Sequence, residues 1–205
     1  AQLNEIVQFL DNYLNVSKID DRSLNGLQVE NAQEIKKIAR GVDACAERLE
    51  KANRADAQLI IVHHGIFWKD SEIRAIGLMA GRMKYLFVNN ISLYAAHLPL
   101  DIHLKIGNGA LIASAFGLKY IRPFGEYSNG CAAGIIGEFE KEVSVDDFIS
   151  KTESVIGKVI RKNMFGKPRV KKIVVVSGGG ANYLEDAKKQ GADLFLTGET
   201  KHITD

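Results

Sequence analysis

The sequence predicts an α/β protein made of two similar, duplicated α/β units with mixed, largely parallel sheets. Strand-like apolar segments alternate with helix-forming segments along the 205 residues, an order typical of parallel sheets. An internal repeat supports the duplication. Ile35–Ile38 (IKKI) aligns with Val170–Ile173 (VKKI), and the same offset of 135 positions aligns Leu59–Ile61 with Leu194–Leu196. Any two strand–helix–strand units look alike, but the absence of a gap favours a true repeat.

The first unit is predicted to span residues 1–122. Apolar spacing and short apolar runs define its elements, which are a helix over 2–15, a strand over 27–29, a strand over 35–42, a helix over 44–55, a buried strand from Leu59 into His63 and His64, a helix over 77–89, a strand over 91–95 and a helix over 108–116. Gly117 is expected to end the last helix. Residues 20–26 are predicted as a polar turn. Pro99 argues against a helix around it because proline lacks a backbone N–H.

The second unit is predicted to span residues 123–205. Pro, Gly, Ser and Asn cluster over 122–130 and suggest a turn region at a domain boundary. The elements expected after it are a strand over 131–139, a helix over 145–155, a strand over 170–176, a helix over 182–190 and a strand over 193–197. Ser144 suits the N-cap of the first of these helices, with Asp147 in its first turn.

The repeat also bears on the end of the second unit. It aligns His63 and His64 with Gly198 and Glu199, and the next strand of the first unit leads into His97 and Asp101. The counterparts of that strand and the helix before it would fall beyond position 205. We therefore expect the second unit to lack a final helix and strand within this sequence.

Composition excludes several functional classes. Apolar residues make up 46% and charged residues 25% of the chain, with a net charge of +2, so we expect a soluble protein without a nucleic-acid partner. Cys45 and Cys131 fit no metal or redox spacing, and reduced thiols are typical of the cytoplasm. Neither a run of 18 apolar residues nor a signal peptide is found, so no membrane partner is expected.

Polar residues follow two neighbouring strands of the first unit. His63 and His64 end one apolar strand, and His97 and Asp101 follow the next. Taken alone, a histidine pair is more often structural, but parallel strands end at the same sheet edge, so the four groups are expected to converge there. Imidazole with carboxylate suits Zn, Fe, Mn or Ni. Adjacent residues on a strand point to opposite faces, which favours two metals, or one metal and an outer partner.

Other motifs give weaker signals. Ser177–Gly180 lies between a strand and a helix, where backbone amides cradle phosphate in some proteins, but it has no nucleotide-binding fingerprint and is better explained as a tight turn. No nucleophile elbow (GxSxG) is present. Glu199 closes the last strand, and we expect it to act near the site as a base or as a hydrogen-bond acceptor.

Several segments closely resemble the YbgI-like proteins, the dinuclear metal-centre hexameric proteins often labelled GTP cyclohydrolase I type 2 homologues. The resemblance covers nearly the whole chain. It rests on NGLQVE (Asn25–Glu30), GVDAC (Gly41–Cys45), IIVHHGIFW (Ile60–Trp68), AAHLPLDIHLKIGN (Ala95–Asn108) and LTGE (Leu196–Glu199).

The resemblance implies two similar α/β domains, a toroidal homohexamer and metal sites that face its inner cavity. It implies that His63, His64 and Asp101 ligate two divalent metal ions, with Asp101 as the bridge. It places His97 outside the ligand set, in a catalytic or substrate-binding role. The family's remaining ligands, a His and a Glu in a GH-x-x-x-E segment, are not found in these 205 residues. Glu199 and His202 do not match that pattern.

Two functions from different classes are consistent with these residues. The first is a dinuclear metal-dependent hydrolase that acts on a nucleotide or a related small molecule by metal-hydroxide attack. The second is a non-catalytic metal-binding, chaperone or regulatory interaction protein. Metal binding without turnover would separate the second from the first.

Overall fold

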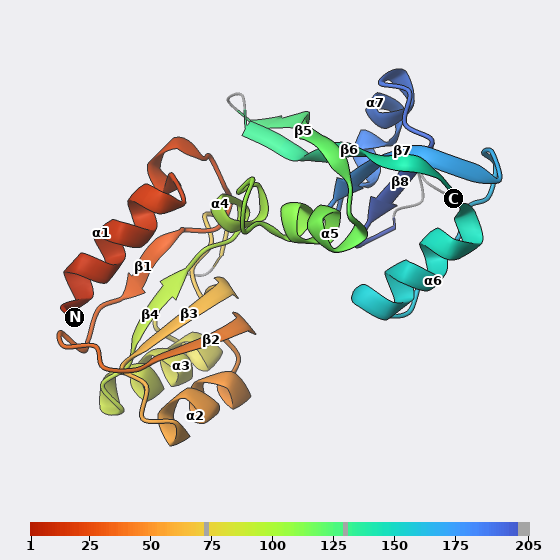
Figure 1. The fold of residues 1–205 in the computed structure, drawn as a ribbon. Helices are drawn as coiled ribbons and strands as arrows, with labels where there is room; N and C mark the ends of the chain where they lie inside the picture. Colours follow the sequence, from red (N-terminus) through yellow and green to blue (C-terminus); the bar gives the residue numbers. More distant parts are fainter. Residues whose placement is uncertain (72–73, 129–130, 201–205) are drawn as a thin grey trace. The chain divides into compact units, whose positions relative to one another are not determined.

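The computed structural model describes residues 1–71, 74–128 and 131–200. The chain divides into two compact units, Ala1–Leu100 and Asp101–Asp205, whereas the sequence placed the boundary at residue 122. Each unit contains one four-stranded mixed sheet with helices packed on it (Figure 1). The predicted α/β class with two units is therefore confirmed.

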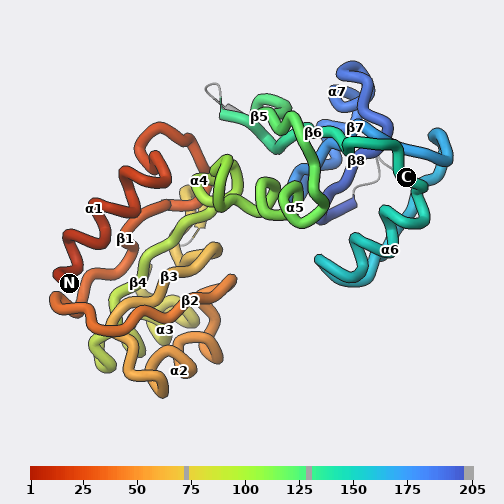
Figure 2. The backbone as a smooth tube through the Cα atoms, in the orientation of Figure 1, coloured from red at the N-terminus to blue at the C-terminus, as the bar shows by residue number. Residues whose placement is uncertain are grey.

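The first unit has the strand order β1-β4-β3-β2. β3 pairs in parallel with both β2 and β4, and β1 is antiparallel to β4 (Figure 2). The strands are β1 (Gly26–Val29), β2 (Ile38–Asp43), β3 (Leu59–His64) and β4 (Ser92–Ala95), and the helices are α1 (Leu3–Tyr13), α2 (Ala46–Arg54) and α3 (Gly77–Val88), with a short 3-10 helix η1 (Val16–Lys18).

Helices cover both faces of this first sheet. Ile60 and Val62 pack in one buried cluster with Leu49 of α2 and Leu86 of α3. Leu59, on the opposite face, packs in a second cluster with residues of α1. Burial on both faces explains why β3 has an unbroken apolar run rather than an alternating one.

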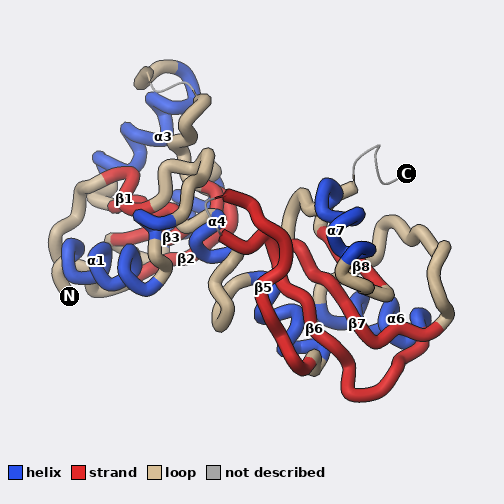
Figure 3. Tube along the Cα trace, turned by 90° about the horizontal axis from the view of Figure 1, so that it is seen from above, coloured by secondary structure: helices blue, strands red, loops and turns tan. Residues whose placement is uncertain are grey.

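The second unit has the strand order β5-β6-β7-β8. Its elements are α5 (Asn108–Phe116), β5 (Lys119–Ser128), β6 (Cys131–Ser144), α6 (Val145–Val155), β7 (Arg169–Val176), a short 3-10 helix η2 (Ala181–Tyr183), α7 (Leu184–Lys189) and β8 (Leu194–Thr197). β5, β6 and β7 lie side by side (Figure 3). Only β7 and β8 pair in parallel, while β5 with β6 and β6 with β7 pair antiparallel. Parallel pairing thus predominates in the first sheet but not in the second. β5 and β6 follow each other without a crossover helix, as antiparallel neighbours can, and β6 and β7 are antiparallel although α6 lies between them.

The internal repeat is a repeat of structure. Ile38 pairs with Leu59 in the first sheet, and Ile173 pairs with Leu194 in the second. Both residues of the second pair lie 135 positions after those of the first, and both pairings are parallel. The same strand register therefore recurs in the two units.

The turn that precedes the second strand of each repeat, β3 in the first unit and β8 in the second, is repeated as well. The Gln58 side-chain oxygen accepts hydrogen bonds of 3.0 Å from the backbone N–H groups of Lys36 and Lys37. Asp193, at the equivalent position, accepts 3.0 Å bonds from those of Lys171 and Lys172. In each unit these bonds satisfy backbone N–H groups that come before the first parallel pair of the two repeated strands. The match between the two units therefore extends beyond the apolar pattern.

Most local signals hold, and two expectations are wrong. Gly117 ends α5 in the left-handed region with φ of 73°, and the Ser144 side chain accepts from the Asp147 N–H at the start of α6. Pro99, however, lies in a one-turn helix, α4 (Leu98–Asp101), because proline is tolerated where the N–H has no helical acceptor. Residues 122–128 belong to β5, an edge strand in which Pro123 is permitted.

The glycine-rich segment 177–180 connects β7 to η2 and α7. Gly178 has a φ of +63°, and a Cβ on Gly180 would lie 2.6 Å from Val176. The glycines are explained by this tight turn, as predicted. Within the described residues, no helix has the length and apolar character needed to cross a bilayer.

The repeated turn gives a test of stability. Replacing Asp193 by Ala should lower the free energy of unfolding by about 1–2 kcal/mol, and Gln58→Ala by about 0.5–1 kcal/mol, because a charged acceptor makes the stronger bonds. Urea denaturation measures both values. Gln8→Ala, on the exposed face of α1, is the control. A loss for Asp193→Ala no greater than that of the control would show that this turn contributes nothing.

Candidate metal centre

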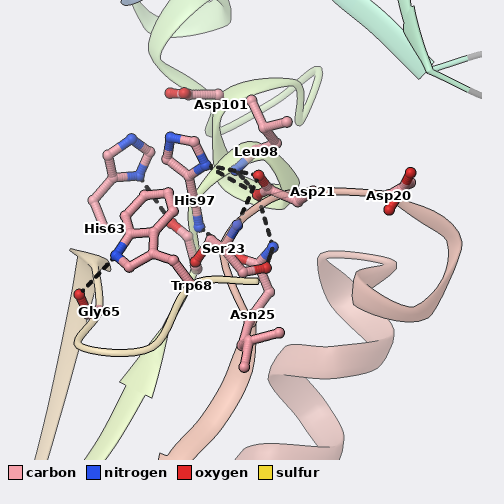
Figure 4. A network of polar contacts seen from close by, with 12 residues as sticks. Asp20, Asp21, Ser23, Asn25, His63, Gly65, Trp68, His97, Leu98 and Asp101 are labelled. Carbon is pink, nitrogen blue, oxygen red and sulfur yellow. Dashed lines mark hydrogen bonds and ion pairs between the residues drawn. The ribbon is translucent and has the colours of Figure 1, made fainter. Parts of the chain in front are cut away.

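Three histidines meet where β3 and β4 end. The parallel pairing of these strands stops at Val62 and Ala95, so His63 and His64 extend past the last pair, and His97 follows two residues after β4. One ring nitrogen from each histidine lies within 4.8 Å of the other two. The predicted convergence at this sheet edge is confirmed for these three residues. Figure 4 shows two of them, His63 and His97, side by side.

The side chains of His63 and His64 do not point away from each other, as adjacent side chains on an ideal strand would. The ring centroids of His63 and His64 are 4.6 Å apart, and each lies within 5.5 Å of the His97 ring centroid. The reason is their position at the end of β3. Beyond the last pairing with β4, no neighbouring strand on that side separates the two faces of the sheet.

The imidazole rings of His63 and His64, at the end of β3, are each held by an oxygen atom. His63 Nδ1 lies 2.9 Å from the carbonyl oxygen of Ala96, and His64 Nδ1 lies 2.7 Å from a carboxylate oxygen of Asp43, the last residue of β2. A carbonyl or carboxylate oxygen can only accept, so Nδ1 donates in both rings. In the neutral imidazole the lone pair is then on Nε2, the tautomer in which many metal-binding histidines are fixed.

His97 is held in the same tautomer by a buried carboxylate. Its Nδ1 lies 3.0 Å from both side-chain oxygens of Asp21. The backbone N–H of His97 donates to the Asn25 side-chain oxygen at 2.7 Å, and the N–H of Leu98 donates to Asp21 at 3.0 Å. Both the ring and the main chain of His97 are therefore attached to the segment before β1.

Asp21 is ionised in this environment. Burial by itself would raise the pKa of its carboxyl, but hydrogen bonds from His97, from the Asn25 side chain and from the Leu98 N–H outweigh burial and lower the pKa from 3.8 to about 2. The Ser23 N–H donates a further bond of 3.2 Å. An ionised Asp21 can only accept, which is consistent with a proton on His97 Nδ1.

The loop that follows the histidine pair is held by Gln28. The Gln28 side-chain oxygen accepts from the N–H groups of Ile66 and Phe67, at 2.8 and 3.1 Å, and its amide donates to Leu24 O at 2.7 Å. A Cβ on Gly65 would collide with this amide. Asn25 and Gln28 of the NGLQVE segment thus bind the main chain at His97 and in the loop after His64, respectively. The glycine of HHG leaves room for the Gln28 side chain.

Trp68 forms an aromatic wall beside the histidines. Its ring centroid lies 5.1 Å from that of His97, edge to face, and 6.0 Å from that of His64. Its indole N–H donates to Gly65 O at 3.2 Å, which fixes the ring over the loop (Figure 4). An apolar ring therefore lies against one side of the cluster.

Two other predicted site residues lie outside the three-histidine group. Asp101 ends α4 and begins the second unit, and its Oδ1 accepts a 2.6 Å hydrogen bond from Asn108. Glu199 follows β8 at the position that matches His64 in the repeat, and its backbone N–H donates to Gly178 O at 3.0 Å. The roles of Asp101 as a ligand and of Glu199 as a base stay predictions.

The donor set fits a divalent metal. Three neutral imidazoles with outer oxygen partners are a common protein contribution to catalytic zinc sites, which keep one position open. Sequence reasoning found His63, His64 and His97 but missed Asp21, because residues 20–26 have the composition of a solvated turn. The spacing of Asp21 and Asn25 ahead of a strand is the only signal that could have identified it.

The comparisons with known proteins agree with this architecture. The family model Duf34/NIF3 (NGG1p interacting factor 3) matches residues 1–204. A Pyrococcus abyssi protein named "GTP cyclohydrolase 1 type 2 homolog" is 42% identical over 97% of this chain and 78% of its own length, and a Haemophilus influenzae protein of the same name is 37% identical over 98% and 79%.

Solved structures give the same result. The ybgI protein, whose structure is titled "unknown function", superposes with a TM-score of 0.91 at 34% identity and covers all of this chain and 81% of its own. A Thermus thermophilus protein superposes with a TM-score of 0.84 at 33% identity, over 98% of this chain and 79% of its own. Sequence, fold and family model agree, and the chain belongs to the Duf34/NIF3 family.

Proposed function

We propose that this protein is a metal-dependent hydrolase whose substrate is a nucleotide or a related small molecule. One observation carries the proposal: His63, His64 and His97 converge with their Nδ1 atoms all engaged by oxygen. In the neutral form of each ring the lone pair is then on Nε2, which leaves that nitrogen able to bind a metal. The relatives' name, GTP cyclohydrolase 1 type 2 homolog, supports a purine nucleotide as the first substrate to examine.

Each residue has a defined part in this proposal. His63 and His64 bind the metal, and the family resemblance adds a second ion with Asp101 as the bridge. When bound, divalent ions supply a water nucleophile of lowered pKa and stabilise the leaving oxygen. Trp68 lies against His64 and His97, and its proposed part is to limit the access of water on that side, which would strengthen electrostatic interactions there. Glu199 is proposed as a base or as a hydrogen-bond acceptor.

The alternative is a metal-binding protein without catalysis, such as a metal chaperone or a regulatory partner. The same three histidines support it, because outer oxygen partners fix metal ligands whether or not chemistry follows. We also propose, from the family resemblance, a toroidal homohexamer. Native mass spectrometry of the full-length protein should give a single hexameric species, and a monomer or dimer at micromolar concentration would exclude the ring.

Metal binding can be followed through Trp68, the only tryptophan in the chain. Its ring lies beside His64 and His97, so Co²⁺ or Ni²⁺ at the histidines should quench its fluorescence to saturation. Zn²⁺, with a filled d shell, should compete and restore emission. His64→Ala should weaken the Co²⁺ affinity by at least about 100-fold, since loss of an outer partner alone costs about 10- to 100-fold.

His103→Ala is the matched control, because it removes a histidine that does not belong to the three-residue group. It should leave the Co²⁺ titration unchanged. Equal quenching in the wild type and in His64→Ala would show that the metal binds elsewhere.

Catalysis needs a separate assay. The full-length protein, loaded in turn with Zn²⁺, Mn²⁺ and Fe²⁺, should consume GTP, and His64→Ala should reduce turnover by at least about 100-fold because a ligand is lost. Loss of purine absorbance reports attack on the ring, and free phosphate reports attack on a phosphoester. If metal binding saturates but neither signal appears, the protein does not turn over GTP, and the non-catalytic function is favoured.

A further inference from the structure

β2 is an outer strand of the first sheet. It pairs with β3 on one edge, and its other edge has no partner strand among the described residues. Two β-branched residues of β2, Ile38 and Val42, are 46% and 56% exposed, and their spacing places them on the same face of the strand. An edge strand presents unpaired N–H and C=O groups to any extended chain that fits it. The outer edge of β2 is therefore open to a further strand.

The internal repeat shows what such an edge accepts. β7 takes the place of β2 in the second unit, with Ile173 lying 135 positions after Ile38, and it pairs with β8 as β2 pairs with β3. The outer edge of β7 is paired antiparallel with β6. Ile135 of β6 packs in one buried cluster with Ile173, which is fully buried, whereas Ile38 is half exposed. By this analogy, the outer edge of β2 is suited to an antiparallel strand.

The charges along β2 specify the side chains of a strand that would fit it. Arg40 lies between the two exposed apolar residues, and neither Arg40 nor Lys37 forms an ion pair in the described part of the chain. In the second unit, Lys172 takes the place of Lys37 and lies 3.8 Å from Glu138, the residue of β6 that pairs with it. Opposite charges in opposed positions stabilise a pair of strands. A matching strand would thus carry carboxylates opposite Arg40 and Lys37.

A second copy of β2 fits this edge poorly. If β2 paired antiparallel with its own copy so that Ile38 met Val42 of the partner subunit, Arg40 would face Arg40 of the partner subunit. Like charges in directly opposed positions destabilise a pair of strands. Registers shifted by two residues would place Arg40 opposite an apolar residue instead. The charge of the edge therefore favours a strand from another protein.

We propose that the outer edge of β2 is a docking site for an extended segment of another protein, which adds to the first sheet as an antiparallel strand. This segment carries a carboxylate opposite Arg40, between two β-branched or aromatic side chains that cover Ile38 and Val42. In this mode of recognition, main-chain hydrogen bonds supply affinity and alternate side chains supply specificity. The inference goes beyond the proposed metal-dependent function and does not depend on it.

The test uses the full-length protein and two fluorescein-labelled peptides, SVTEVIES and SVTKVIES. In the proposed register the fourth residue of each peptide lies opposite Arg40, the second and sixth lie opposite Val42 and Ile38, and the seventh, a glutamate, lies opposite Lys37. Fluorescence anisotropy measures binding. The wild type should bind SVTEVIES about 5-fold more tightly than SVTKVIES, because one cross-strand pair changes from attraction to repulsion.

Arg40→Glu should reverse this preference, because the repulsive pair becomes the one with SVTEVIES. The matched control is Lys162→Glu, which makes the same change of charge at an exposed residue outside the helices and strands of the second unit. This control should keep the wild-type preference. Binding of SVTEVIES should also slow hydrogen exchange at the backbone amides of β2 and leave exchange unchanged in β5, the outer strand of the second sheet.

Several results would overturn the proposal. They are a failure of the wild type to bind SVTEVIES, equal binding of the two peptides, a preference that Arg40→Glu leaves unchanged, and slowed exchange outside β2 instead of within it. A native mass of Arg40→Glu that differs from the wild type would show that another copy of the chain occupies this edge, and would overturn it too. Arg40 does not belong to the metal centre, so Co²⁺ binding and GTP turnover should be unchanged in Arg40→Glu, and failure of either proposal leaves the other standing.

Discussion

The parallel pairing of β3 with its two neighbours is the constraint on which the site depends. β3 receives β2 on one side and β4 on the other, so the groups that follow all three strands appear at one edge. β2 contributes Asp43, β3 contributes His63 and His64, and the chain after β4 contributes His97. A shift of one residue in this register would exchange the faces of β3 and expose its apolar side chains. The burial of Leu59, Ile60 and Val62 therefore helps to fix the position of the histidines that follow them.

The duplicated second unit separates what the fold supplies from what the site supplies. β7 and β8 repeat the register of β2 and β3, and the turn before β8 repeats the side-chain bonds of the turn before β3. The edge itself is different. Thr197 Oγ1 accepts from Gly180 N–H and donates to Gly178 O, both at 2.9 Å, so the equivalent edge holds a glycine turn where the first unit has imidazoles. The same backbone thus serves two purposes, and function belongs to the residues at its edge.

The sequence predicted those parts that depend on local pattern or on a simple topological rule. Capping by Ser144 and termination at Gly117 are local, and the convergence of His63, His64 and His97 follows from the parallel edge. β5 was missed because Pro123 and the glycines near it have turn-like composition, which an edge strand tolerates. Asp21 was missed for a different reason. It lies 76 positions before His97, and only the tertiary fold removes it from water.

The burial of Asp21 indicates how the site is organised before any metal binds. A buried carboxylate adds little net stability, because desolvation opposes the attraction of its partners. Without the His97 imidazole, much of that cost would remain uncompensated. The segment before β1, the loop after His64 and the His97 ring are therefore expected to order together, since each supplies hydrogen bonds that the others need. Such coupling gives a rigid donor set, and a rigid donor set loses less conformational freedom when an ion is bound.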